Sequence, residues 1–241
     1  MIFVAGLLAL VLVFPVLAAE RPKGLENKGP LTKMTLIHYK RGYAKPDWVG
    51  GKGKPKEEKC YSFLAKGAKW KSQIGEPYKI NPLRSGLNYN FVRTAIEAGV
   101  NEWENYGTNI FGASEIDEDV TYDGETWDEI NTVDFGLYPN DNVIAVATVW
   151  GYFSGPPSTR EIVEWDMLFN THWSWGNGND SENSVMDLQN IATHELGHSA
   201  GMGHPDNACT EETMYAYSVL DETKKRDLNT GDIKGIVELY K

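Results

Sequence analysis

The chain has 241 residues, enough for one sizeable domain with a core and short additions. Its net charge is −11, which argues against nucleic-acid binding because phosphates would be repelled. The charge is uneven: residues 20–59 carry 11 basic and 5 acidic residues (net +6), whereas residues 60–241 carry 12 and 29 (net −17). The basic segment therefore either docks on the acidic part or is a solvated linker.

The N-terminus predicts export. Residues 2–18 are almost continuously apolar and end in Leu17, Ala18 and Ala19, a small-residue end typical of a signal-peptidase site. We therefore expect a signal peptide over 1–19, a secreted protein and no stable association with a membrane. The alternative is an uncleaved anchor, because an apolar run of this length is just long enough to span a bilayer.

Residues 20–59 are rich in Lys, Gly and Pro and show no sustained period. They predict a short basic pro-segment or linker, with Gly50–Lys56 flexible or extended. The folded domain is expected over 60–241. The chain has two cysteines, Cys60 and Cys209, and an even pair in an exported protein predicts a disulfide.

Helix and strand patterns alternate along the domain, and an acidic stretch at 113–131 reads as a surface loop. The expected strands are Tyr78–Ile80, Thr132–Phe135, Val143–Trp150 and Glu161–Phe169. The expected helices are Asn88–Tyr106, a helix from about Ser184 to Gly201, and Thr230–Tyr240. Ser184 and Asp187 resemble a capping box at the start of the second helix. This order predicts an α+β fold with a mixed sheet.

The strongest signal is His194-Glu195-Leu196-Gly197-His198, followed by Gly201 and His204. Residues four apart lie on one face of a helix, so His194 and His198 can reach one metal ion. Gly201 permits the sharp turn that returns His204 as a third ligand. Three protein ligands with an open fourth position predict a single catalytic zinc.

The carboxylate beside the first histidine defines the expected chemistry. Glu195 is placed to take a proton from zinc-bound water, which then attacks a polarised carbonyl. We expect an endopeptidase, a zinc hydrolase, that cuts extended polypeptides. Two alternatives stay open: a zinc amidase acting on small or glycan-linked amides, and a non-catalytic binding module that retains the fold.

The motif, with Thr213-Met214-Tyr215 ten residues after its last histidine, resembles the metzincin clan, and most closely the matrixin (matrix metalloproteinase) catalytic domain. Pro77–Asn81, Phe91–Trp103 and Leu228–Tyr240 are similar to that family's first strand, first helix and closing helix. The resemblance implies a twisted mixed five-stranded sheet with an antiparallel edge strand, three helices and a Met-turn at Met214.

The resemblance also implies a substrate cleft. An extended polypeptide would pair with an edge strand at Leu168, Phe169 and Asn170, and Tyr215-Ala216-Tyr217 would form the wall of a side-chain pocket. Ala216 stands where astacins and serralysins carry a zinc-bound tyrosine, which disfavours those families.

The sequence also bears on a second zinc, on calcium and on the mechanism of latency. Leu168 stands where many matrixins have a structural-zinc histidine, so a second zinc is not expected. Structural calcium is left open, because several acidic and amide side chains suit it. The family's cysteine-switch sequence is missing from 20–59, and Cys60 as a ligand in a latent precursor is the alternative to the disulfide. We expect a monomer.

Overall fold

The protein is described by a computed structural model that covers residues 28–43 and 59–241 apart from 73, 181 and 183. The predicted signal peptide and the Gly50–Lys56 run lie outside the described residues. Within the described part of the chain, no helix combines the length and apolar character needed to cross a membrane.

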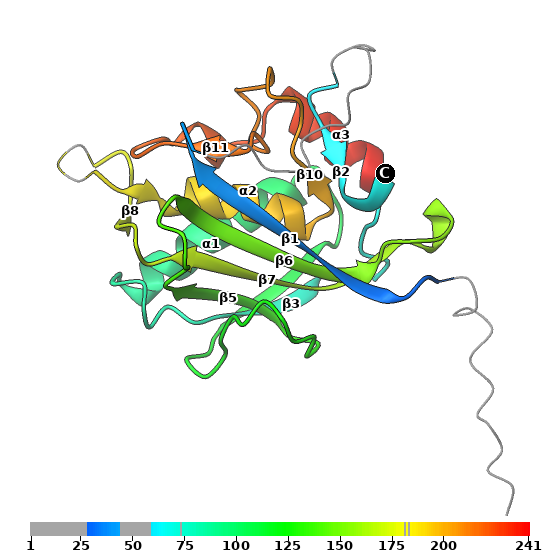
Figure 1. The fold of residues 1–241 in the computed structure, drawn as a ribbon, viewed down its shortest axis with the longest axis horizontal. Helices are drawn as coiled ribbons and strands as arrows, with labels where there is room; N and C mark the ends of the chain where they lie inside the picture. Colours follow the sequence, from blue (N-terminus) through cyan, green and yellow to red (C-terminus); the bar gives the residue numbers. More distant parts are fainter. Residues whose placement is uncertain (1–27, 44–58, 73, 181, 183) are drawn as a thin grey trace, which may run out of the picture.

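Three helices and a mixed sheet form one body (Figure 1). The helices are α1 (Tyr89–Glu104), α2 (Leu188–Ser199) and α3 (Thr230–Tyr240). The longer strands are β1 (Leu31–Lys40), β3 (Glu76–Ile80), β4 (Phe111–Ile116), β5 (Asn131–Gly136), β6 (Val143–Tyr152) and β7 (Glu161–Asn170). Two-residue strands are β2 (Ser62–Phe63), β8 (Trp175–Gly176), β9 (Met186–Asp187), β10 (Met202–Gly203) and β11 (Tyr217–Ser218).

The expected five-stranded sheet is present and carries two further strands. Strands β4, β3, β5 and β7 are parallel, and β6 runs antiparallel to β7 at the edge of this set. Strand β1 then pairs antiparallel with β6 and parallel with β11, giving the order β11-β1-β6-β7-β5-β3-β4. The α+β class is confirmed, and the strand count is seven instead of five.

The core lies between the sheet and helices α1 and α2, which pack against each other. The crossing is close because Gly99 of α1 has no side chain: a Cβ there would lie 2.9 Å from Thr193 Oγ1 of α2. Trp103 of α1 is fully buried and donates its indole N–H to the Thr193 carbonyl at 2.7 Å. These contacts fix α2, the helix that carries the histidine motif.

The linker interpretation is wrong for residues 31–40. Strand β1 pairs with β6 from Leu31 opposite Tyr152 to Tyr39 opposite Val143, and Leu36 and His38 point into the protein. The burial alternates only from Met34 to His38, and Thr32, which has the inward parity, is exposed, so the period was too short to recognise. The folded body therefore includes part of the segment before Cys60.

Helix ends differ slightly from expectation. Helix α2 begins at Leu188 because Asp187, not Ser184, is its N-cap and accepts a hydrogen bond from the Asn190 N–H at 2.8 Å. Helix α3 has the predicted bounds and a capping box between Asn229 and Asp232. The region expected to be a loop at 113–131 begins with strand β4, which pairs with β3.

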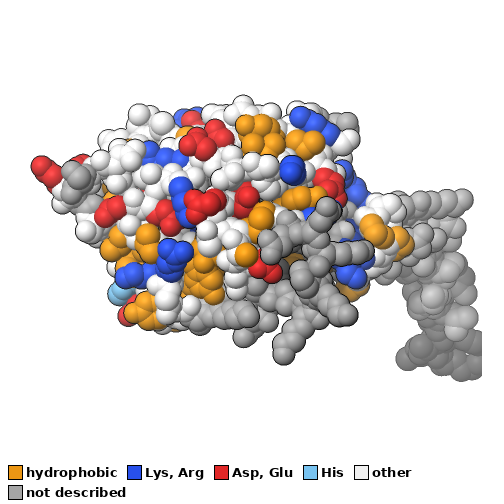
Figure 2. All heavy atoms as spheres, turned by 90° about the horizontal axis from the view of Figure 1, so that it is seen from above, with side chains coloured by type: hydrophobic (Ala, Val, Ile, Leu, Met, Phe, Trp, Pro, Cys, Tyr) orange, Lys and Arg blue, Asp and Glu red, His pale blue; other side chains and the backbone are white. Residues whose placement is uncertain are grey.

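The face seen from above carries acidic and basic side chains side by side (Figure 2). On this face no broad area of one sign is visible, so the acidic surplus is dispersed here.

The predicted disulfide is present: Cys60 and Cys209 are bonded, with Cα atoms 5.4 Å apart and 149 positions apart in sequence. Closing so long a loop restricts the unfolded chain, a stabilisation of about 4–5 kcal/mol in the chain-entropy model. We expect the Cys60→Ser, Cys209→Ser double variant to lose stability of this order. Denaturant unfolding of both proteins without reductant measures it, and equal midpoints would contradict the expectation.

Asp166 on β7 is a buried carboxyl whose charge is costly. Burial first, and then the charge of Glu164, raise the pKa of Asp166 to about 8. The folded pKa of Asp166 lies above its unfolded value. The contribution of this carboxyl to the free energy of unfolding is therefore present below about pH 4 and is lost as the pH rises to about 8. We expect Asp166→Asn, which keeps the acceptor for the Thr132 N–H, to raise the melting temperature at pH 8 and not at pH 4. A loss at pH 8 would contradict this.

Candidate metal centre and catalytic site

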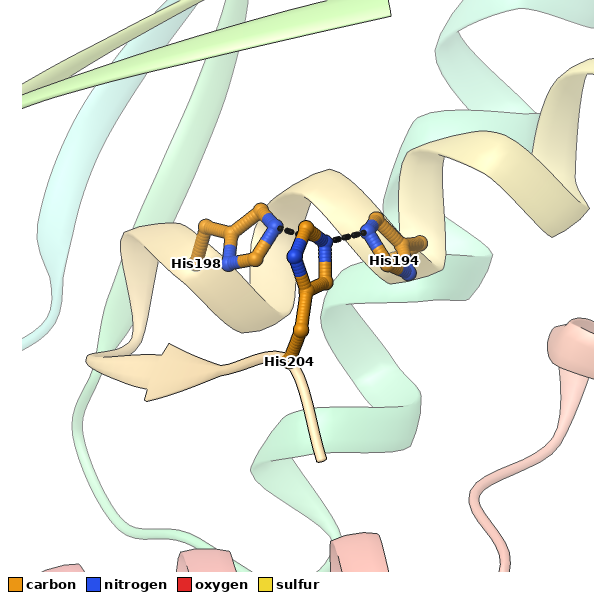
Figure 3. Close-up of side chains that lie close together, drawn as sticks. All are labelled: His194, His198 and His204. Atoms are coloured by element: carbon orange, nitrogen blue, oxygen red, sulfur yellow. Dashed lines mark hydrogen bonds between the residues drawn. The ribbon is translucent and has the colours of Figure 1, made fainter. Parts of the chain in front are cut away.

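The three motif histidines converge as predicted. His194 and His198 project from one face of α2, and His204 follows the short strand β10 (Figure 3). The Nε2 atoms of His194 and His198 each lie 3.1 Å from Nε2 of His204. Two nitrogens bound about 2.0–2.1 Å from a tetrahedral zinc lie roughly 3.3 Å apart, so the spacing is that of a zinc site.

The hydrogen bonds behind the rings orient their lone pairs. His194 Nδ1 lies 2.7 Å from the Thr213 carbonyl and His198 Nδ1 lies 2.9 Å from the Met202 carbonyl. Each Nδ1 must donate its proton to the carbonyl, so both Nε2 atoms are bare acceptors. Lone pairs aimed at one point need a cation, and the residues therefore fit zinc.

Burial keeps the three rings uncharged. It lowers the pKa of His198 to about 4 and the pKa values of His194 and His204 well below the usual range. The hydrogen bond to the Met202 carbonyl opposes this at His198, and the charge of Lys225 lowers all three pKa values further. At neutral pH the imidazoles are therefore ready to ligate without losing a proton.

Glu195 lies beside the triad and is fully buried. Its Oε1 lies 3.0 Å from Nδ1 of His38, and its Oε2 has no hydrogen-bond partner among the described residues. Burial raises the pKa of Glu195 well above its usual range, while the charge of Lys225 opposes this. A buried carboxylate with an unused oxygen beside a metal site is suited to hold and pass on a proton.

Met214 lies beneath the motif, as the resemblance implied. It is fully buried, and a Cβ added to Gly197 of α2 would lie 2.2 Å from the Met214 sulfur. The turn is held by Asp232 at the start of α3, which accepts the N–H groups of Thr213 and Met214 at 2.6 and 3.1 Å. Because Thr213 also orients His194, the closing helix is linked to the metal ligands.

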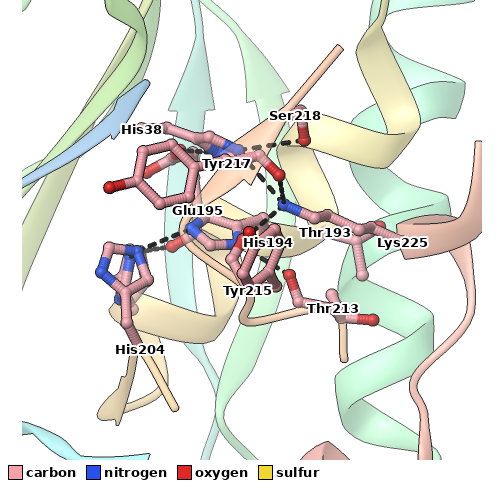
Figure 4. Close-up of polar contacts among 12 residues, drawn as sticks. His38, Thr193, His194, Glu195, His204, Thr213, Tyr215, Tyr217, Ser218 and Lys225 are labelled. Atoms are coloured by element: carbon pink, nitrogen blue, oxygen red, sulfur yellow. Dashed lines mark hydrogen bonds and ion pairs between the residues drawn. The ribbon is translucent and has the colours of Figure 1, made fainter. Parts of the chain in front are cut away.

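A second polar cluster meets the site from the other side (Figure 4). His38 of β1 is fully buried, and its ring centroid lies 4.0 Å from that of His194. Its Nε2 lies 3.2 Å from Nζ of Lys225 and 3.1 Å from Oγ of Ser218. Lysine can only donate, so Nε2 accepts from Lys225, and Nδ1 carries the proton that it donates to Glu195.

The ring of His38 thus lies against the carboxylate of Glu195. Among the described residues, two groups of three potential ligands stand out: the motif triad, and His38 with His194 and Glu195. The side chain that completes the second group comes from a strand that lies along β6, beside the metal centre.

The predicted template for substrate is wrong. Leu168, Phe169 and Asn170 lie on β7, which is paired with β5 on one side and β6 on the other. All three side chains are buried. A strand paired on both sides cannot accept another chain, and the antiparallel edge strand of the five-stranded set is β6.

The segment predicted to form the wall of a side-chain pocket contacts Lys225 and strand β1. Tyr215, Ala216 and Tyr217 follow the Met-turn, and the carbonyls of Tyr215 and Tyr217 both accept hydrogen bonds from Lys225. Tyr217 also pairs with Tyr39 of β1. His38 and Lys225 are the functional candidates that the sequence reasoning missed, because no motif marks a single histidine and a single lysine far apart in the chain.

Three metal-oriented histidines, a buried carboxylate beside them and a methionine turn below lie together on a metzincin-like fold. A model of the matrixin family matches residues 69–241, and the chain belongs to this family. Every residue of the motif lies within the matched range, and β1 lies before it.

Individual relatives agree with this assignment. The chain is 30% identical to stromelysin-2 of Rattus norvegicus over 224 residues, which are 90% of this chain and 40% of that protein. It is 39% identical to metalloendoproteinase 1-MMP of Arabidopsis thaliana over 61 residues, 25% of this chain and 16% of that protein. It is 26% identical to metalloendoproteinase 5-MMP of Arabidopsis thaliana over 135 residues, 47% and 36% respectively. The chain spans less than half the length of these relatives.

Proposed function

We propose that this protein is a secreted, zinc-dependent endopeptidase that hydrolyses internal peptide bonds of extended polypeptides. The observation that carries the proposal is the convergence of three imidazole lone pairs beside the unpaired Oε2 of Glu195. We propose one zinc ion, held by His194, His198 and His204. Calcium, the monomeric state and the signal peptide over 1–19 remain predictions.

When bound, zinc supplies a Lewis acid that polarises a substrate carbonyl and makes a water molecule more acidic. Glu195 takes a proton from the attacking water and returns it to the leaving amine. The closed, buried surroundings of Glu195 strengthen this proton transfer by excluding bulk water. Thr213 and Met202 keep the imidazoles in the tautomer that ligates.

Strand β1 supports an extended polypeptide as the substrate. It runs antiparallel to β6 and parallel to β11, and its inward-facing His38 contacts Glu195 beside the metal centre. A substrate strand taking the same course would add to the sheet by main-chain hydrogen bonds, which recognise extended chains of many sequences.

The same strand supports the pro-segment interpretation of residues 20–59. While β1 is paired with β6, the sheet edge and the space next to Glu195 are both filled by the chain itself. We propose that this arrangement is a latent form and that displacement of β1 activates the enzyme. Latency would then depend on a histidine-bearing strand and not on a cysteine.

A digestion experiment tests the proposed function against the amidase alternative. The chain with β1 displaced is incubated with zinc and a mixture of unstructured peptides, and separately with small acylated amines. We expect cleavage at internal peptide bonds that a chelator stops and added zinc restores. Release of amines from the small amides alone, with intact peptides, would contradict the endopeptidase and favour the amidase.

A further inference from the structure

Lys225 is a buried cation that the proposed reaction does not use. It belongs to a short helical turn, Lys224–Arg226, and none of its surface is exposed. Its Nζ contacts the carbonyls of Tyr215 and Tyr217 and Nε2 of His38. These three acceptors satisfy the three protons of the ammonium group.

No carboxylate pairs closely with this ammonium. In the part of the chain that the structure describes, the ion pairs within 4.0 Å do not include Lys225. Glu222 instead accepts from the Ser218 hydroxyl at 3.1 Å. Burial lowers the pKa of Lys225 to about 7, as expected of a cation without a close counter-ion.

The third acceptor of Lys225 is supplied by β1 itself. If β1 leaves, two carbonyls remain on Nζ and the third N–H points into the space that the His38 ring had filled. That space is lined by His194, Glu195, Ser218 and Lys225 (Figure 4). A strand that replaces β1 along β6 must place one of its own side chains there, next to the site of bond cleavage.

We propose that Lys225 is a specificity-determining residue and that this space, the Lys225 pocket, takes the side chain of a glutamate next to the scissile bond. The inference rests on the proposed endopeptidase function and names its substrate class. The terminal oxygens of glutamate are as many covalent bonds from Cα as Nε2 of histidine, so they can reach Nζ as His38 does. A carboxylate also gives the buried ammonium its missing counter-ion, and a charge-assisted hydrogen bond is stronger than a neutral one.

Glutamate fits better than other candidates. Aspartate is one bond shorter and cannot reach Nζ from the same backbone position. Leucine leaves one buried N–H of Lys225 without an acceptor, which is costly. Glutamine supplies the acceptor without the charge. The carboxylate of Glu195 lies at the opposite side of the pocket, where His38 contacts it through Nδ1 and not through Nε2.

The pocket can be tested inside the zinc-loaded full chain without measuring catalysis. His38 is replaced by Glu, Gln or Leu, and hydrogen exchange of the residue 31–40 amides is measured by mass spectrometry at pH 6. We expect His38→Glu to slow the exchange of the β1 amides about tenfold relative to His38→Leu, with His38→Gln between them. This factor corresponds to the free energy that one charge-assisted hydrogen bond contributes.

The same three His38 variants are then made in a Lys225→Met background, which completes a double-mutant cycle between positions 38 and 225. In that background we expect His38→Leu to protect β1 better than His38→Glu, because the carboxylate would be buried without a partner. Lys224→Met is the matched control: Lys224 is an exposed neighbour that binds the Thr210 carbonyl and Glu211, and its loss should leave the order unchanged. Should Lys225→Met fail to fold, the three His38 variants decide alone.

Equal or better protection by Leu or Gln than by Glu, with Lys225 in place, would overturn the proposal.

Failure of the pocket proposal can be distinguished from failure of the endopeptidase proposal. If the exchange order holds but the chain cleaves no peptide, the pocket stands and the endopeptidase falls. If peptides are cleaved but the exchange order fails, only the glutamate preference falls. In the active protein, sites with glutamate beside the cut should be preferred, and Lys225→Met should remove that preference.

Discussion

Replacing Glu195 by glutamine is expected to lower the rate of peptide hydrolysis about 10²–10⁴-fold, the usual contribution of a general base. The amide keeps the size of the side chain and can still contact His38, so the fold should survive. It cannot accept and return a proton at neutral pH, so the turnover number should fall much more than the affinity for substrate. Initial rates of peptide hydrolysis, compared between the parent chain and the variant with β1 displaced in both, measure the effect.

Zinc content is the control for this variant. The proposed zinc ligands are the three motif histidines, and Glu195 is not among these ligands. The Glu195→Gln variant should therefore hold as much zinc as the parent protein. A variant that keeps both its zinc and its hydrolysis rate would show that another group moves the proton.

Displacing β1 is expected to raise peptide hydrolysis at least a hundredfold. Leu36 is 1% exposed on the inward face of β1, and aspartate there loses apolar burial and would bury a charge. Together these costs exceed about 2.7 kcal/mol, which corresponds to a hundredfold shift in the equilibrium between docked and displaced strand. The catalytic body should stay folded, because the family model begins only at residue 69.

Thr35→Asp is the matched control for Leu36→Asp. Thr35 precedes Leu36 on the same strand, and its side chain is exposed, so the added charge remains in water. Rates with a short peptide substrate compare the two variants with the parent chain. If hydrogen exchange shows that β1 has left in Leu36→Asp and hydrolysis does not rise, β1 is not the element that holds the enzyme inactive.

The local features of the site were predictable because they depend on spacing within short segments. The positions of His194 and His198 follow from one helical turn, and His204 follows from the glycine turn at Gly201, whose φ is +98°. The closing helix was predicted to the residue, since its caps and apolar stripe lie within one segment. Met214 was placed by its distance from the motif and by family resemblance.

The course of the N-terminal segment was not predictable because it depends on pairing between distant residues. Strand β1 is stabilised by a sheet edge more than a hundred residues further along the chain, and only Leu36 and His38 of its side chains are fully buried. The cleft assignment to Leu168–Asn170 failed for the same reason. A buried strand can be recognised from its run of apolar residues, but those residues do not tell which strands pair with it in the sheet.

The most direct measurement of the central claim, that three histidines hold one zinc beside Glu195, is the metal content of the purified chain. Elemental analysis after dialysis should find one zinc per chain, and His204→Ala should lose it. His172→Ala is the control, because His172 lies outside the motif and pairs with Asp141 at 3.3 Å on the surface. One zinc in the parent and in His172→Ala, with loss in His204→Ala, is the predicted result. A parent chain without zinc, or a His204→Ala chain that keeps it, would contradict the account.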